Sequence, residues 1–388
     1  MRAGWRRKAW EIGMLKALVR AACLMTGAAV LGAGGASATP VTDCPLGRQA
    51  LSTASPLSDV LAVPRARAVL DEASPGLVEA LTKPFGGGTL PPGFDRIVTP
   101  KALLGMAGKG DAAFLTKLDA ALGRIRLTRA DVVARCASYD NERPALPANL
   151  ARPAILVFGK ITGFRDAPSV DAAETALKDI AARHGWGLVF TDKGGVFNAA
   201  DLSRFDAVVW NNISGDALTI PQRAAFRKWI ERGGGYAGIH GSGGDPQFFW
   251  DWYADTLVGA RFIGHPMAPQ FQEARVVVED KAHPAAYGLP SEWRMTEEWY
   301  SFDRSVRGKA RVIASLDESS YNPGEGFGRK LSMGDHPIAW SQCVGSGRSF
   351  YTAIGHRPES YVQPESVKLL EQGILWAAGL APEGCGGK

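Results

Sequence analysis

Short apolar runs alternate with amphipathic stretches from about residue 154 onward. Four apolar runs have the length of strands buried on both faces of a sheet: 154–158, 187–191, 206–210 and 236–239. Apolar side chains at helical spacing predict helices between them, over 170–184 and 219–231. This alternation is typical of a doubly wound parallel sheet, in which ligands bind at the carboxyl ends of the strands.

The pattern of apolar and polar residues differs on either side of this α/β region. Beyond Gly259 the chain is β-rich, with strands expected at 275–279, 311–316, 337–343 and 349–354 and a closing helix at 366–378. Residues 39–140 form a helical accessory region, whose last helix begins at Thr128 with Asp131 three residues on, the pattern of a capping box. A proline-punctuated linker is expected at 141–152, the α/β domain at 153–380 and a tail at 381–388.

The first 38 residues are predicted to be an export signal. Six basic residues and one acidic residue lie in this segment, an uncharged run spans 21–33, and Ala36-Ser37-Ala38 is a small-x-small cleavage pattern. The uncharged run is shorter than the about 20 residues that span a bilayer, and no later stretch is long enough. We therefore expect a periplasmic or secreted protein with no membrane span after signal removal.

Removal of this segment also removes the charge imbalance. The whole chain has a formal charge of +5, whereas residues 39–388 carry 38 basic and 38 acidic residues. A protein with no net charge and no cluster of Lys or Arg residues lacks the positively charged surface that binds a phosphate backbone, so nucleic acid is not an expected partner.

Because the chain is expected to be exported, we expect its cysteines to form structural disulfides. The segment after the signal contains Cys44, Cys136, Cys343 and Cys385, an even number suited to an oxidising compartment. Four cysteines allow three connectivities. We expect Cys44 to pair with Cys136 and Cys343 with Cys385, which would close the N-terminal region and tie the tail to the main domain. The absence of a Cys-x-x-Cys pair argues against a thiolate zinc site.

Histidines concentrate where the predicted sheet would bind a ligand. Five of the six lie between His240 and His356. His240 ends the fourth parallel strand, within Gly-Ile-His-Gly-Ser-Gly-Gly at 238–244, where related folds place a nucleophile at a crowded turn. An imidazole there excludes a Cys-His amidase mechanism. His356 follows the last predicted strand and would face the same crevice if the sheet order brings the two together.

Carboxylates and aromatic residues accompany the histidines. Glu297 and Glu298 are either a solvated surface pair or an acid/base group with split pKa values. Trp252 and Trp299 could offer ring faces to a sugar, with Tyr253 beside them. Two imidazoles and a carboxylate could hold a divalent metal such as zinc, although no short His-x-x-x-His spacing supports it. No nucleotide cofactor is expected.

Seven segments taken together make the chain resemble the ThuA-like family, named for trehalose utilisation, in the class I glutamine amidotransferase-like superfamily. They run in order over about residues 153–380: 163–165, 233–240, 252–260 with Phe262 and 265–266, 283–284, 297–300, 336–340 and 345–356. The resemblance implies a flavodoxin-like sheet, a role in the metabolism of sugars including oxidised sugars, and no amidotransferase cysteine. Where the family often has a histidine after Gly-Phe-Arg, this chain has Asp166.

Two functional hypotheses follow. The first is an exported enzyme that acts on a glycoside or keto-sugar by hydrolysis, elimination or isomerisation, with His240, Glu298 and His356 as acid/base groups or metal ligands. The second is a non-catalytic carbohydrate-binding protein, with the aromatic side chains as platforms for the sugar and the histidines as hydrogen-bonding or packing groups. In the first hypothesis the crevice also contains the substrate-binding residues Asp166, Trp252, Tyr253, His265, Trp299 and His336. A small carbohydrate is the expected partner in both, and the sequence leaves the oligomeric state open.

The export hypothesis predicts a mature chain that begins at or near Thr39. Signal peptidases cut after small residues at the pattern formed by Ala36 and Ala38. Mass spectrometry of the protein from a periplasmic fraction should therefore find that N-terminus. An intact Met1 or Met14 in that fraction would contradict the prediction.

Overall fold

The computed structural model describes residues 39–83, 88–244, 250–326, 328–381 and 385. The predicted signal at 1–38 and most of the predicted tail lie outside this part of the chain. Pro40–Lys388 forms one compact unit. No helix among the described residues has both the length and the apolar character needed to cross a membrane.

Short helices occupy the region before residue 140. They are α1 (Leu57–Leu61), α2 (Pro64–Ala73), α3 (Leu77–Thr82), α4 (Pro100–Met106), α5 (Ala112–Gly123) and α6 (Arg129–Arg135). A leucine- and valine-rich cluster forms their core. The predicted capping box is present, because the Asp131 amide donates to Thr128 Oγ1 at 3.2 Å and the Thr128 amide donates to Asp131 Oδ2 at 2.7 Å.

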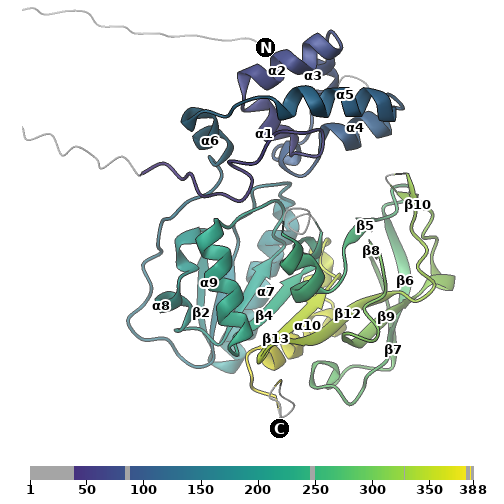
Figure 1. The fold of residues 1–388 in the computed structure, drawn as a ribbon. Coiled ribbons are helices and arrows are strands. Elements are labelled where there is room, and N and C mark those ends of the chain that lie inside the picture. Colours follow the sequence, from purple (N-terminus) through teal and green to yellow (C-terminus); the bar gives the residue numbers. More distant parts are fainter. Residues whose placement is uncertain (1–38, 84–87, 245–249, 327, 382–384, 386–388) are drawn as a thin grey trace, which may run out of the picture. The chain divides into compact units, whose positions relative to one another are not determined.

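A nine-stranded sheet forms the centre of the described α/β domain (Figure 1). Its parallel strands run in the order β2-β1-β3-β4-β13, the flavodoxin-like order. Their bounds are β1 Ala154–Phe158, β2 Gly187–Thr191, β3 Ala207–Asn211, β4 Gly235–Ile239 and β13 Gly347–Thr352. The apolar runs predicted all five strands to within two residues.

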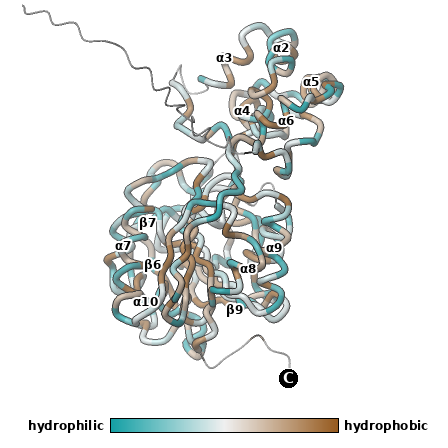
Figure 2. Tube along the Cα trace, turned by 90° about the vertical axis from the view of Figure 1, so that its left-hand side faces the viewer, coloured by the Kyte–Doolittle hydropathy of each residue, from teal (hydrophilic) through white to brown (hydrophobic). Residues whose placement is uncertain are grey.

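Helices cover both faces of the parallel strands. α7 (Ala167–His184) and α10 (Pro364–Ala377) lie on one side, and α8 (Ala199–Leu202) and α9 (Ile220–Glu231) lie on the other (Figure 2). Because both faces are covered, β1, β3 and β4 are buried along their whole length. The predicted doubly wound architecture is therefore confirmed.

Antiparallel strands extend the sheet beyond β13. They are, in order, β12 (Pro337–Val344), β9 (Arg311–Asp317), β6 (Phe271–Val278) and β7 (Glu292–Glu298). These strands are the predicted β-rich additions. β7 was not predicted, because Glu292, Arg294 and Glu298 interrupt the apolar pattern on which strand prediction depends. A π-helical segment, Trp252–Val258, follows β4 in the chain.

Both expected disulfides are present. Cys44 bonds to Cys136, and Cys343 on β12 bonds to Cys385, with Cα–Cα distances of 5.5 and 5.4 Å. The first bond joins residues 92 apart in the sequence and the second joins residues 42 apart. Two disulfides are compatible with an oxidising compartment outside the cytoplasm.

Loss of the longer disulfide loop should destabilise the protein more than loss of the shorter one. We expect the C44S/C136S variant to lose about 2–4 kcal/mol of unfolding free energy, because the bond restricts the unfolded chain over a longer loop. C343S/C385S should lose less. Urea unfolding under non-reducing conditions measures both changes, and equal stability of the first variant and the wild type would contradict the prediction.

Candidate functional site

His240 and His356 meet because their strands are neighbours. His240 follows β4 directly, and His356 lies four residues after β13, which pairs with β4 in parallel register. The backbone of His240 has φ +37°, an uncommon conformation for a residue other than glycine. Gly355 lies close to both His240 and Tyr361. A Cβ at position 355 would stand 2.5 Å from the Tyr361 hydroxyl and 3.3 Å from the Cβ of His240. The turn is therefore packed tightly around both histidines.

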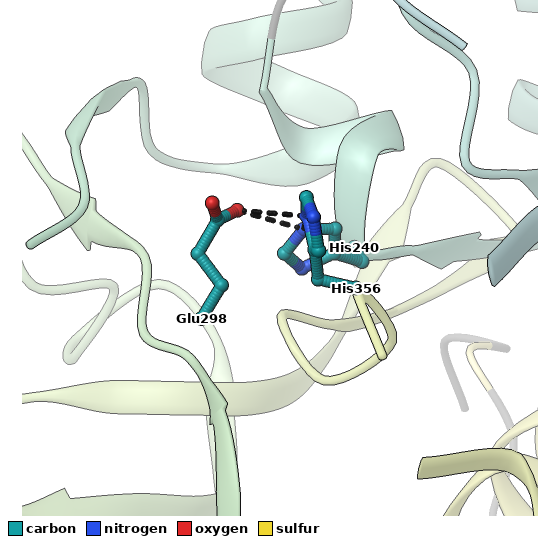
Figure 3. Close-up of side chains that lie close together, drawn as sticks. All are labelled: His240, Glu298 and His356. Carbon is teal, nitrogen blue, oxygen red and sulfur yellow. Dashed lines mark hydrogen bonds and ion pairs between the residues drawn. The ribbon is translucent and has the colours of Figure 1, made fainter. Parts of the chain in front are cut away.

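Glu298 completes a buried cluster with these two histidines (Figure 3). Its Oε2 lies 3.2 Å from His240 Nε2 and 3.0 Å from His356 Nδ1, and the two nitrogens are 3.2 Å apart. The Glu298 and His240 side chains are 2% and 3% exposed, whereas that of His356 is 18% exposed. One side of the cluster is therefore closed by the core, and the other opens at His356.

The ring of His240 is oriented by a main-chain contact. Its Nδ1 lies 2.7 Å from the Ala353 carbonyl oxygen, which can only accept, so Nδ1 carries a proton and donates it. The ring also packs on Tyr300, with centroids 4.0 Å apart. In the neutral imidazole, Nε2 then presents a lone pair to Glu298 and His356.

Glu297 holds the two loops of the site together. One of its carboxylate oxygens accepts from the Glu298 amide at 2.9 Å, and the other accepts from the Gly355 amide at 3.0 Å and from the Ser360 hydroxyl. Both glutamates are buried. The interpretation of Glu297-Glu298 as a solvated surface pair is therefore wrong, because neither side chain reaches solvent.

The two glutamates titrate in opposite directions. Burial raises the pKa of Glu297, and the nearby His240 and the three hydrogen bonds only partly offset it. Burial also opposes ionisation of Glu298, but its bonds to His240 and His356 outweigh that effect and hold its pKa well below the usual value. For His356, burial favours the neutral ring, and the contact with Glu298 more than reverses this, so its pKa is raised.

Asp166 and His265 lie next to the cluster, as expected. The Asp166 Oδ2 atom is 3.9 Å from His356 Nε2, beyond a direct hydrogen bond but within reach of one bridging water. Ser169 Oγ contacts both the Asp166 carboxylate and the His356 carbonyl. His265 Nδ1 is 3.3 Å from Glu298 Oε1. These residues contact the cluster from the α7 and β5 (Phe262–Gly264) sides.

Four other predicted substrate contacts lie elsewhere. Trp299 and Tyr253 are completely buried, so their rings have no face for a sugar, and that prediction is wrong. Trp252 is half-buried against Trp250, with Arg227 over its ring.

His336 is a buried structural residue rather than a crevice residue. Its Nδ1 contacts Glu318 Oε1 at 2.8 Å, and its Nε2 donates to the Tyr300 carbonyl at 2.9 Å. Both nitrogens are therefore paired within the core.

A small pocket of about 50 Å³ opens onto the two histidines. Among the described residues it is lined by Phe164, Asp166, Ser169, Asn212, Ser214, His240, Gly241, Tyr300 and His356.

Asn212 and Gln270 are site residues that the sequence did not reveal. Asn212 has φ +51°, and its side chain accepts from the Gly241 amide and donates to the Tyr361 hydroxyl. Gln270 Nε2 donates to Glu298 Oε1 at 2.5 Å. The position of Asn212 after the third apolar run was a usable signal, because ligands meet strand ends. Gln270 follows no such pattern.

The cluster can bind a proton or a cation. One ligand atom from each of His240, Glu298 and His356 lies within 4.8 Å of the others. Imidazole nitrogen and carboxylate oxygen are also the groups most often used for general acid–base catalysis.

These features define a flavodoxin-like α/β protein with a histidine-rich site at its strand ends. The chain belongs to the ThuA family, described as trehalose utilisation, whose sequence model matches residues 154–377. No curated protein matches the chain in a sequence comparison.

The chain is similar to several solved structures. A Bacteroides uniformis protein described as ThuA-like is 25% identical with a TM-score of 0.50, over 61% of this chain and 95% of that one. A Parabacteroides merdae protein described in the same way is 18% identical with a TM-score of 0.43, over 60% and 92%. A Thermotoga maritima structure described as PurLQS is 14% identical with a TM-score of 0.37, over 57% and 98%.

Replacement of His336 by alanine should lower stability rather than remove a reacting group. The change removes a hydrogen bond to the Tyr300 carbonyl and one of several hydrogen bonds to the Glu318 carboxylate, and each such loss costs about 1–3 kcal/mol. Urea unfolding at pH 7 should therefore show a loss of about 2–4 kcal/mol.

The difference between this variant and the wild type should shrink in acid. The hydrogen bond with His336 is the largest cause that holds the pKa of Glu318 at about 2, below its usual 4.5. A depressed pKa stabilises the fold above the unfolded value, and this stabilisation is lost as pH falls from 4.5 toward about 2. A difference that grows in acid would contradict this role.

Proposed function

We propose that this protein is an exported carbohydrate-active enzyme that acts on a glycoside or keto-sugar by hydrolysis, elimination or isomerisation. The observation that carries the proposal is the convergence of two imidazoles and a carboxylate at one end of the pocket, with 3.0–3.2 Å between their facing atoms. Three ionisable groups buried together are costly to a fold, and such clusters occur preferentially where chemistry takes place.

The backbone supports a reactive role for His240. A left-handed conformation costs a residue other than glycine about 1–2 kcal/mol, and His240 and Asn212 both adopt it at the pocket wall. Strain of this kind gathers at active sites, where the surroundings hold a side chain in one orientation. A residue that served only to fill the core would not need it.

The burial of Trp299 and Tyr253 weakens the alternative of a non-catalytic sugar-binding module. That alternative relied on exposed aromatic platforms, and these two rings are closed in by the core. The pocket wall instead offers Asp166, Ser169, Asn212 and Ser214, which suit hydrogen bonds to the hydroxyls of a small sugar. The family description, trehalose utilisation, agrees with a sugar substrate.

A keto-sugar is the substrate best suited to these groups. The hydrogen on the carbon next to a ketone is acidic, so a carboxylate can remove it when the carbonyl oxygen is polarised. The cluster is placed to polarise the oxygen, and Asp166 on the same wall is placed to take the proton. The electron pair left on carbon forms an enolate. In an isomerisation the enolate is reprotonated on carbon, whereas in an elimination it expels an oxygen substituent from the adjacent carbon, and that oxygen takes up the proton that Asp166 removed.

The export proposal rests on the basic N-terminal segment and the two disulfides. Both are expected of a chain that matures in an oxidising compartment.

The H240N variant should lose turnover while it retains its fold. Asparagine tolerates the left-handed backbone at this position better than alanine does, and its amide can still donate a hydrogen bond. We expect kcat/KM for oxidised disaccharides to fall by about 100-fold or more, and the unfolding free energy by less than about 2 kcal/mol.

The H184N variant is the matched control, since His184 lies on α7 with Glu371 as its partner. Turnover is followed by chromatography of oxidised and ordinary disaccharides in D₂O. Solvent deuterium in the product supports proton abstraction. The enzyme proposal fails if neither sugar class is turned over by the wild type.

A further inference from the structure

We infer that His240 Nε2, His356 Nδ1 and Glu298 Oε2 form a binding site for one divalent transition metal of the zinc type. The catalytic use of this metal rests on the function proposed above, whereas its binding can be tested without any substrate.

The spacing of the three atoms is close to that of a zinc coordination sphere. Ligand atoms about 2.0–2.2 Å from zinc at tetrahedral angles stand about 3.3–3.6 Å from one another. The three atoms here form a nearly equilateral triangle with sides of 3.0, 3.2 and 3.2 Å. Each therefore needs to move by only a few tenths of an ångström to accept the ion.

The hydrogen bond of His240 determines which of its ring nitrogens faces Glu298. Nδ1 of His240 donates a hydrogen bond to the Ala353 carbonyl, so Nε2 is the ring nitrogen that faces the carboxylate of Glu298. This nitrogen and the Glu298 carboxylate oxygen are 3.2 Å apart, so both face the point that a cation would occupy. A divalent ion satisfies all three groups at once, whereas a single proton can bridge only two.

Residues that contact the proposed ligands orient them, as such residues do in known metal sites. The contact of His240 with a backbone carbonyl fixes its tautomer, and Gln270 fixes the second oxygen of Glu298. Glu297 binds the main chain at both Glu298 and Gly355, next to His356. His240 and Glu298 are therefore each held by a second residue, and the main chain next to His356 is held by Glu297.

The site has the form of a catalytic metal centre. Three protein ligands leave a fourth position, and His240 and His356 both line the pocket from which a water or a sugar oxygen would approach. Two nitrogen ligands and one oxygen ligand favour Zn²⁺, Co²⁺ or Ni²⁺ over Mg²⁺ and Ca²⁺, which prefer oxygen. The ion would act as a Lewis acid on the substrate oxygen, with Asp166 beside it as the base.

Metal binding is tested on the full-length chain, expressed and purified without a histidine tag. The protein is treated with EDTA, dialysed, and titrated with Zn²⁺, Co²⁺ and Mg²⁺. Metal content is measured by mass spectrometry, and affinity by calorimetry against a competing chelator. We expect about one Zn²⁺ or Co²⁺ per chain, no retained Mg²⁺, and the visible spectrum of four-coordinate Co²⁺.

Three variants locate the ion. H240N, H356N and E298Q should each weaken Zn²⁺ binding by more than about 100-fold, above the range typical of outer-contact substitutions. H184N should bind as tightly as the wild type. E298Q preserves the volume of the buried side chain, and urea unfolding of each variant separates loss of the site from loss of the fold.

The outcomes separate the two proposals. Wild-type protein that retains no Zn²⁺ or Co²⁺, or three folded variants that bind like the wild type, overturns the metal site. Unchanged sugar turnover in the metal-free protein overturns the catalytic use of the metal, and the enzyme proposal then stands without it. Tight binding that the three variants abolish supports the metal site even if no sugar is turned over, and only the enzyme proposal then fails.

Discussion

The site depends on side chains that balance the charge of the buried Glu298 carboxylate. An ionised carboxylate that is 2% exposed is stable only with close partners, and here these are His240, His356, His265 and Gln270. These partners come from separate segments of the chain. Removal of Glu298 would leave two inward-facing imidazoles without a common partner, and removal of the histidines would leave a buried charge.

Curvature of the sheet brings Glu298 to the histidines. β7 stands five strands from β4 in the sheet order, a separation of about 24 Å in a flat sheet at the usual spacing. The observed distance from Glu298 Oε2 to His240 Nε2 is 3.2 Å. The antiparallel strands must therefore turn back over the carboxyl ends of the parallel strands. Twist accumulated along a sheet provides such a turn.

Glu297 and Gly355 help to hold the strand and the loop that carry Glu298 and His356 in place. The buried Glu297 carboxylate binds the main chain on β7 and on the loop after β13, so that the two halves of the sheet are held at a fixed separation. Gly355 lets the loop pass close to His240 and Tyr361. The histidine–glutamate contacts therefore depend on groups that do not themselves face the pocket.

The sequence by itself determined the parallel strands and the position of His240 at a strand end, and the four cysteines after residue 38 limited the disulfides to three connectivities. The strands and the turn follow from local patterns, because an apolar run of strand length and a glycine-rich turn act over a few residues. Only the tertiary structure decided that Glu298 is buried beside His240, that Trp299 and Tyr253 belong to the core, and that His336 is structural. Those outcomes depend on contacts between distant segments and on the curvature of the sheet, and neither leaves a periodic signal in the sequence.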